Sequence, residues 1–206
     1  MLKICLAGVG PGGEKYVLPV VREQVEAADV LLGGARATAP FLSLQKEIIP
    51  LTGKLEGLAE RLRKLAALKK IVVLVSGDPG FYSLLAYLRR HFTAAELEVL
   101  PGVSSMQVAF ARLAEPWQDA TLLSAHGRNG EELLPSLLRP GKKAILTDQQ
   151  WTPGRIAKMI LGAGGSDTGV ALCYRLTTPA EEIQRTRLSL LDAATAGDCV
   201  MVIEDA

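Results

Sequence analysis

Short apolar runs alternate with longer amphipathic stretches in the first half of the chain, and this alternation restricts the possible folds most strongly. The clearest run is Ile71–Val75, in which all five residues are apolar and four are β-branched, as is typical of a strand covered on both faces. Leucines recur at helical spacing in the preceding stretch, 54–69, opposite a charged face, which predicts an amphipathic helix. The alternation predicts a mostly parallel sheet with helices on both faces.

The same pattern places the other elements of the first half. We expect strands over 2–7, 30–32 and 97–100, and helices over 18–28, 81–90 and 104–114. Residues 114–118, which include Pro116, interrupt the pattern and predict a linker.

The second half ends differently from the first. We expect strands over 120–124, 143–147 and 168–174, and helices over 130–138 and 152–161. Polar and apolar residues then alternate over 182–188, and 199–203 is an apolar run, which predicts antiparallel strands in a mixed sheet. The sequence therefore predicts two α/β domains, 1–114 and 119–206.

Charge and composition exclude several classes of protein. Lys and Arg number 23 against 22 Asp and Glu, so no global basic field draws the chain to nucleic acid or to an anionic membrane. No run approaches the roughly 20 apolar residues of a membrane span. The three cysteines lack metal-ligand spacing and there are two histidines, so we expect a reduced, cytoplasmic protein without a metal site.

A glycine-rich loop, 8–13, directly follows the first predicted strand. Gly8, Gly10 and Gly13 match the spacing of a dinucleotide-binding motif, which also requires an acidic residue after the second strand. Asp29 comes before that strand, and Pro11 removes a backbone N–H that a pyrophosphate would need, so a nicotinamide-linked oxidoreductase is disfavoured. A tight turn and a close backbone approach to another ligand remain as interpretations.

Two more loops follow strands in the same way. Asp78 lies in Ser76-Gly77-Asp78-Pro79-Gly80. It either faces a ligand at the carboxyl end of the sheet or forms an Asx or N-cap arrangement that opens the predicted helix 81–90. In Pro101-Gly102-Val103-Ser104-Ser105, the hydroxyl groups either cap the next helix or face a ligand.

His126 and Arg128 flank Gly127 after the first strand of the predicted second domain. A single histidine is usually structural, but this pair at a strand end also suits an anion or base site.

The three loops of the first domain together are more specific than any one of them. The glycine loop, SGDPGFYSL and PGVSS resemble the tetrapyrrole methylase family, and VALCYRLTTPAEEIQRTRL resembles its second-domain strand, turn and strand. The resemblance covers nearly the whole chain. It implies a two-domain class III methyltransferase fold with a ligand cleft between the domains, S-adenosyl-L-methionine as cofactor, and a homodimer.

The resemblance also implies roles for individual residues. Gly13 stands where many members have an Asp, which argues against a general base at that position. The residues expected to contact S-adenosylmethionine, by match to the family's motifs, are Gly10, Pro11, Ser76, Gly77, Asp78, Phe81, Ser104, Ser105, Leu146 and Tyr174.

The substrate implied is an electron-rich macrocycle with several carboxylates. The SGDPGFYSL form and the SAHGR segment are most similar to the branch that methylates C5 of a precorrin in cobalamin biosynthesis. Arg36, His126 and Arg128 are the candidates for holding the carboxylates, and His126 is also a candidate for assisting proton movement. We expect no fused C15-methylating and decarboxylating domain, and a separate CbiT-type enzyme is a candidate partner.

Three alternatives remain open. Within the family, the substrate could be another precorrin position, a metal-free precorrin or the protein substrate of diphthamide synthesis. Outside it, the chain could be a nicotinamide- or flavin-linked oxidoreductase or a non-catalytic scaffold. The scaffold does not explain why three strand ends carry loops of Gly, Pro, Asp and Ser.

Overall fold

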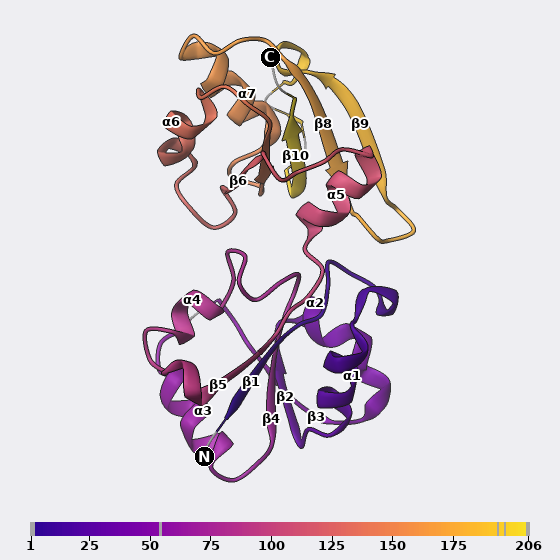
Figure 1. The fold of residues 1–206 in the computed structure, drawn as a ribbon, viewed down its shortest axis with the longest axis vertical. Helices are drawn as coiled ribbons and strands as arrows, with labels where there is room; N and C mark the ends of the chain where they lie inside the picture. Colours follow the sequence, from indigo (N-terminus) through magenta and orange to yellow (C-terminus); the bar gives the residue numbers. More distant parts are fainter. Residues whose placement is uncertain (1–2, 54, 193, 196, 205–206) are drawn as a thin grey trace. The chain divides into compact units, whose positions relative to one another are not determined.

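The computed structural model describes residues 3–53, 55–192, 194–195 and 197–204. The chain divides into two compact units, Met1–Ser104 and Ser105–Ala206 (Figure 1). The division falls before helix α5 (Ser105–Leu113), whereas the sequence places the linker after it. Helix α5 packs against β10 of the second unit, and the Trp117 ring of the expected linker stacks on Phe110 of α5, with the ring centroids 6.5 Å apart.

The first unit contains a five-stranded sheet in the order β3-β2-β4-β1-β5. Every neighbouring pair in this order is parallel, as the alternation of strands and helices predicts. Because the strands run in one direction, the loops that follow them lie along one edge of the sheet. The strands are β1 (Ile4–Gly8), β2 (Val30–Gly33), β3 (Glu47–Pro50), β4 (Ile71–Val75) and β5 (Leu97–Leu100).

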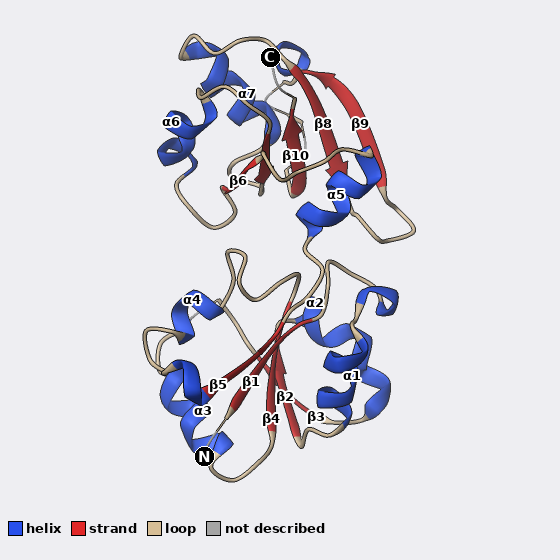
Figure 2. Ribbon diagram, in the orientation of Figure 1, coloured by secondary structure: helices blue, strands red, loops and turns tan. Residues whose placement is uncertain are grey.

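Helices cover both faces of this sheet (Figure 2). One face packs against α1 (Pro19–Glu26) and α2 (Ala35–Thr38), and the other against α3 (Leu58–Ala66) and α4 (Leu85–Leu88). Pro19 occupies the first turn of α1, where its missing N–H costs no helical hydrogen bond. Three short 3-10 segments complete the unit: η1 (Glu14–Tyr16), η2 (Ala39–Leu44) and η3 (Ala94–Glu96).

The second unit contains a mixed sheet in the order β6-β7-β10-β8-β9. Its first pair is parallel and the other pairs are antiparallel, which confirms the predicted mixed sheet. β9 is an edge strand with mostly exposed polar residues, which suits a strand that pairs on one side only. The strands are β6 (Thr121–Ser124), β7 (Lys143–Leu146), β8 (Gly169–Tyr174), β9 (Glu182–Arg187) and β10 (Cys199–Ile203).

One face of the second sheet carries the larger side chains, including Ile145, Leu172 and Met201, and packs against α6 (Leu134–Leu137) and α7 (Pro153–Gly162). Helix α5 also packs in this unit, against β10. Two 3-10 segments, η4 (Gly130–Leu133) and η5 (Leu188–Leu190), complete it.

The structure differs from the local predictions in several places. The expected helix over 81–90 is reduced to α4, and the short edge strand β3 and helix α2 were not predicted. The helix expected over 54–69 is α3, which begins at Leu58. Leu2, Lys54 and the last two residues of the predicted second domain, 205 and 206, lie outside the described residues.

The three cysteines are free and buried. Burial raises the pKa of the Cys5 and Cys173 thiols to about 12 and that of Cys199 to about 11, so all three are protonated at neutral pH. Within the described ranges, no helix has the length and apolar character needed to cross a membrane.

Packing of α3 gives a direct test of this fold. Leu62 is fully buried between α3 and the sheet, whereas Leu68, just beyond the helix, is 85% exposed. We expect Leu62→Ala to lower the free energy of unfolding by about 2–5 kcal/mol. Leu68→Ala should change it by less than about 0.5 kcal/mol. Chemical denaturation of both variants measures the difference, and equal losses would contradict the packing described here.

Candidate functional site

Three loops of the first unit meet where strands β4, β1 and β5 end. Gly8 ends β1, and a Cβ on it would overlap the carbonyl oxygen of Gly77 and lie 2.8 Å from the nitrogen of Gly102. A Cβ on Gly102 would overlap the same oxygen of Gly77 and lie 2.7 Å from the oxygen of Gly8. The three backbones therefore approach so closely that only glycine fits at Gly8 and Gly102.

Hydrogen bonds join the first two of these loops. The N–H of Gly77 donates to the carbonyl of Gly10 over 2.8 Å, and the N–H of Val9 donates to the carbonyl of Val75 over 2.9 Å. Gly10 and Gly77 have φ angles of +81° and +69°, a region that favours glycine. The glycine loop therefore makes a close approach to neighbouring backbone, and its approach to a ligand stays a prediction.

The Asp78 carboxylate joins the second and third loops. It accepts the N–H of Gly80 over 2.7 Å on Oδ1 and the N–H of Gly102 over 3.1 Å on Oδ2. The Asx interpretation of Asp78 is confirmed, because Oδ1 accepts the N–H two residues further on, at Gly80. The N-cap interpretation is wrong, because α4 begins only at Leu85. Asp78 fixes the shape of this edge instead.

The aromatic pair after Asp78 explains why the expected helix is short. The N–H of Phe81 donates to the carbonyl of Asp78 over 3.2 Å, which closes a turn. Tyr82 has a φ of +48°, which is incompatible with a right-handed helix, and its ring meets Phe81 edge to face at 4.8 Å. Tyr82 is 43% exposed, so an aromatic surface stands beside the loops.

The remaining residues expected in the first unit are distributed as follows. Gly10, Pro11 and Ser104 are buried and Ser76 is exposed. Arg36 is exposed on α2, directly after β2 and therefore at the same edge of the sheet as the loops. Ser105 is the first residue of α5 and of the second unit.

Asp29 lies at the opposite edge of the sheet. Its carboxylate accepts the N–H of Lys70 over 2.7 Å, next to the start of β2. This position confirms that Asp29 is at the wrong end of the strand for a dinucleotide-binding acid.

The residues expected in the second unit also share one edge. β6, β7 and β8 end there and β10 begins there, since Leu146 pairs with Val200 and Tyr174 pairs with Cys199. Leu146 is half-buried. Tyr174 is buried, which raises the pKa of its hydroxyl to about 12, and that hydroxyl is hydrogen-bonded to the Cys199 thiol.

His126 and Arg128 are both exposed on the loop that follows β6. Gly127 between them has a φ of +64°, so the loop turns sharply at this residue. The two charged or ionisable side chains are therefore presented at the same edge as Leu146 and Tyr174.

Asp148 was not predicted as a site residue from the sequence. It lies in the neighbouring loop, after β7, and binds the loop that carries His126 and Arg128. Its carboxylate accepts backbone N–H bonds from Gly127, Gln150 and Trp151 over 2.7–2.9 Å. Burial, the largest single influence, pushes the pKa of this carboxyl upward, but the three hydrogen bonds and nearby His126 together leave the pKa below its ordinary value. The available signal was an acidic residue just after a predicted strand.

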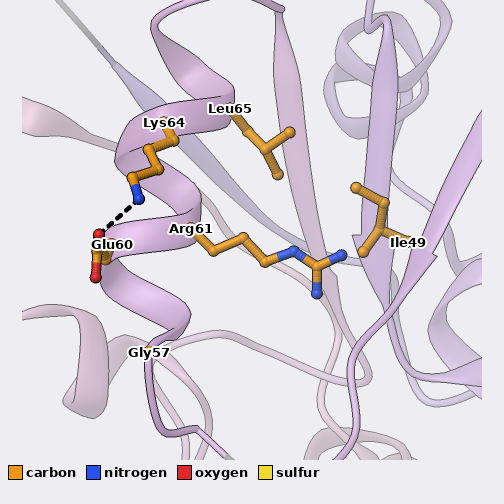
Figure 3. Close-up of a pocket in the computed structure, with 6 residues that line it drawn as sticks. All are labelled: Ile49, Gly57, Glu60, Arg61, Lys64 and Leu65. Atoms are coloured by element: carbon orange, nitrogen blue, oxygen red, sulfur yellow. Dashed lines mark ion pairs between the residues drawn. The ribbon is translucent and has the colours of Figure 1, made fainter.

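A separate hollow lies on α3 and β3, with a volume of about 410 Å³ (Figure 3). Ile49 and Leu65 supply apolar surface, Arg61 extends toward Ile49, and Lys64 pairs with Glu60. None of its lining residues belongs to the two loop edges. Among the described residues, no group of three or more His, Cys, Asp or Glu could hold a metal ion.

Comparison with known proteins gives this fold a family. The model of the Tetrapyrrole (Corrin/Porphyrin) Methylases matches residues 3–192. The uroporphyrin-III C-methyl transferase of Thermus thermophilus, solved in complex with S-adenyl homocysteine, has the same fold at 22% identity, with a TM-score of 0.81 over 98% of this chain and 97% of that one. The fold is therefore that of the class III methyltransferases. The chain belongs to the tetrapyrrole methylase family and is a methyltransferase.

Two curated relatives extend over most of the chain. The cobalt-precorrin-7 C(5)-methyltransferase of Salmonella typhimurium is 29% identical over 98% of this chain and 99% of its own length. The probable cobalt-precorrin-7 C(5)-methyltransferase of Methanocaldococcus jannaschii is 32% identical over 87% of each chain. The family resemblance and the predicted fold class are thus confirmed.

The backbone contact at Gly102 gives a stability test of the loop edge of the first unit, where strands β4, β1 and β5 end; we call it the first edge, and the corresponding edge of the second unit the second edge. We expect Gly102→Ala to lower the free energy of unfolding by about 1–3 kcal/mol, because the added methyl group must displace backbone atoms. Gly34→Ala is the matched control, since a Cβ there meets nothing within 4 Å, and it should cost less than about 0.5 kcal/mol. Thermal unfolding compares the two, and a neutral Gly102→Ala would rule out the close approach.

Proposed function

We propose that this methyltransferase transfers the methyl group of S-adenosyl-L-methionine to C5 of cobalt-precorrin-7 in cobalamin biosynthesis. The names of two relatives that align over most of the chain support the reaction. The observation that carries the proposal is the junction of three glycine loops at the ends of β4, β1 and β5, which forms a compact polar edge at the place where open α/β sheets bind ligands.

The first edge fits a nucleoside that carries an amino acid. Glycine at Gly8 and Gly102 keeps side chains out of the junction, and Phe81 offers a half-buried ring beside it. Ser76 and Ser104 add hydroxyl groups. These features support contacts to S-adenosylmethionine from the residues expected by motif: Gly10, Pro11, Ser76, Gly77, Asp78, Phe81, Ser104 and Ser105.

Two of the expected residues take more specific roles in this proposal. The Asp78 carboxylate already accepts two backbone N–H bonds, so it shapes the loops that contact the cofactor. Tyr174 is buried with its hydroxyl bound to Cys199, so with Leu146 it supports the second edge more than it offers polar contacts.

Alignment is the main task of these residues. S-adenosylmethionine supplies a methyl group already activated by its sulfonium. The loops hold the reactants in line and exclude water, a task that the close backbone contacts of the junction support. His126, exposed on the loop after β6, is the group we assign to proton movement.

Arg36 and Arg128 are the proposed ligands of the macrocycle's carboxylates. Both are exposed at a loop edge, and a guanidinium can bind a carboxylate through two parallel hydrogen bonds. We further propose that the enzyme acts in the cytoplasm as a homodimer and cooperates with a separate CbiT-type C15-methylating enzyme. Sedimentation of the purified protein tests the dimer.

Calorimetric titration tests the cofactor proposal. S-adenosylhomocysteine should bind and NADH should not. Asp78→Asn should weaken that binding by about tenfold, because its amide would face one of the two N–H donors that the carboxylate now accepts. Asp29→Asn changes the same group at the opposite edge of the sheet and should leave binding unchanged. Binding of NADH alone, or equal effects of the two variants, would contradict the proposal.

Steady-state kinetics test the substrate contact. Arg128→Ala should raise the KM for the tetrapyrrole by about tenfold, as expected from loss of a charged hydrogen-bonded pair, and leave the affinity for S-adenosylhomocysteine nearly unchanged. Arg139→Ala removes another exposed arginine of the second unit and serves as the control. An unchanged KM in Arg128→Ala would remove this residue from the site.

A further inference from the structure

The Asp148 carboxylate joins two loops that follow neighbouring parallel strands. Asp148 comes just after β7, and Gly127 lies in the loop after β6. Oδ2 accepts the N–H of Gly127 over 2.9 Å, while Oδ1 accepts the N–H groups of Gln150 and Trp151 over 2.9 and 2.7 Å. One oxygen therefore shapes the residue's own loop, and the other holds the loop that carries His126 and Arg128.

Packing fixes the position from which Asp148 acts. The preceding residue, Thr147, is buried, and its hydroxyl accepts the N–H of Cys199 over 2.9 Å at the start of β10. A Cβ on Gly197 would overlap the backbone carbonyl of Asp148, so these two backbones are in direct contact. The backbone that carries this carboxylate is thus held by contacts on both sides, at Cys199 and at Gly197.

The far end of the His126 loop is held by the same segment. Trp151 is 3% exposed, and a Cβ on Gly130 would overlap its indole ring, so Gly130 packs directly on this ring. The guanidinium of Arg155 also lies over the Trp151 ring, 3.8 Å from its centroid. The loop is therefore attached at Gly127 by a hydrogen bond and at Gly130 by packing.

We propose that Asp148 is a positioning residue for substrate recognition, which holds the backbone between His126 and Arg128 so that the Arg128 guanidinium meets the tetrapyrrole's carboxylates in a fixed arrangement. The inference rests on the proposed function, since it assigns the substrate to this edge. Asp148 itself does not touch the substrate. Without its bond to Gly127, the loop must be ordered again each time the substrate binds, and that cost weakens binding.

Asp148→Asn separates the two functions of the carboxylate. The amide has one acceptor oxygen, which can keep the two bonds from Gln150 and Trp151, and its NH₂ group then faces the N–H of Gly127. The variant should raise the KM for the tetrapyrrole by about tenfold and change kcat by less than about twofold. The affinity for S-adenosylhomocysteine should not change.

Asp167→Asn is the matched control. Asp167 also accepts three hydrogen bonds, from the N–H and hydroxyl of Ser189 and from Arg187, but it precedes β8 and so lies at the opposite edge of the same sheet. If Asp148 were only structural, the two variants would lose similar amounts of stability and their KM values would rise by similar factors. A rise in KM confined to Asp148→Asn at similar thermal stability supports the positioning role.

Two further measurements separate failure of this inference from failure of the proposed function. Hydrogen exchange at Gly127 should accelerate in Asp148→Asn and not in Asp167→Asn, whatever the protein methylates. In an Arg128→Ala background, Asp148→Asn should raise KM by less than about threefold, because the side chain it positions is absent. Unchanged exchange at Gly127, or additive effects on KM, would overturn the inference. Absence of tetrapyrrole methylation by the wild-type enzyme, with faster exchange in the variant, would reject the function and leave the loop attachment intact.

Discussion

The contact of three backbones at Gly8, Gly77 and Gly102 determines the shape of the first unit's functional edge. These residues lie at or after the ends of strands β1, β4 and β5, where a side chain at Gly8 or Gly102 would overlap neighbouring backbone. Because the strands are paired and the loops touch directly beyond their ends, the sheet holds these loops in place. The Asp78 carboxylate adds a second connection through the N–H of Gly102. A site that works by alignment benefits from such a framework, because the bound geometry needs no reordering.

Both units use the same device at their loop edges. In each, an aspartate just after a strand accepts backbone N–H bonds from its own loop and one from a glycine in another loop: Asp78 binds Gly102, and Asp148 binds Gly127. A carboxylate suits this role because its two oxygens accept several bonds at once. Glycine suits the other side because it allows close approach or a positive φ. The exposed groups, among them Tyr82, His126 and Arg128, are then carried on loops of fixed backbone.

The parallel and mixed character of the two sheets and the placement of loops after strands followed from local patterns, whereas the order of the strands and the details of the loops did not. The apolar run Ile71–Val75 and the mixed pattern at the end of the chain identified the two sheets correctly. The helix expected over 81–90 failed because Asp78 and the positive φ of Tyr82 hold those residues in a turn, an effect of contacts with another loop. Asp148 was missed because its role depends on a hydrogen bond from Gly127. That residue is distant in sequence and becomes adjacent only when β6 and β7 pair. The division of the chain falls before α5 because this helix packs against β10, a tertiary contact that the local sequence pattern does not reveal.

The position of the transferred methyl group tests the central claim most directly. Incubating the enzyme with cobalt-precorrin-7 and S-adenosylmethionine labelled with ¹³C in its methyl group, followed by NMR of the product, identifies the methylated carbon. The account predicts one new labelled methyl group on C5, with S-adenosylhomocysteine formed in equal amount. A label on another ring position would contradict the C5 assignment and indicate a tetrapyrrole methylase of different position specificity. Product free of label would contradict the account.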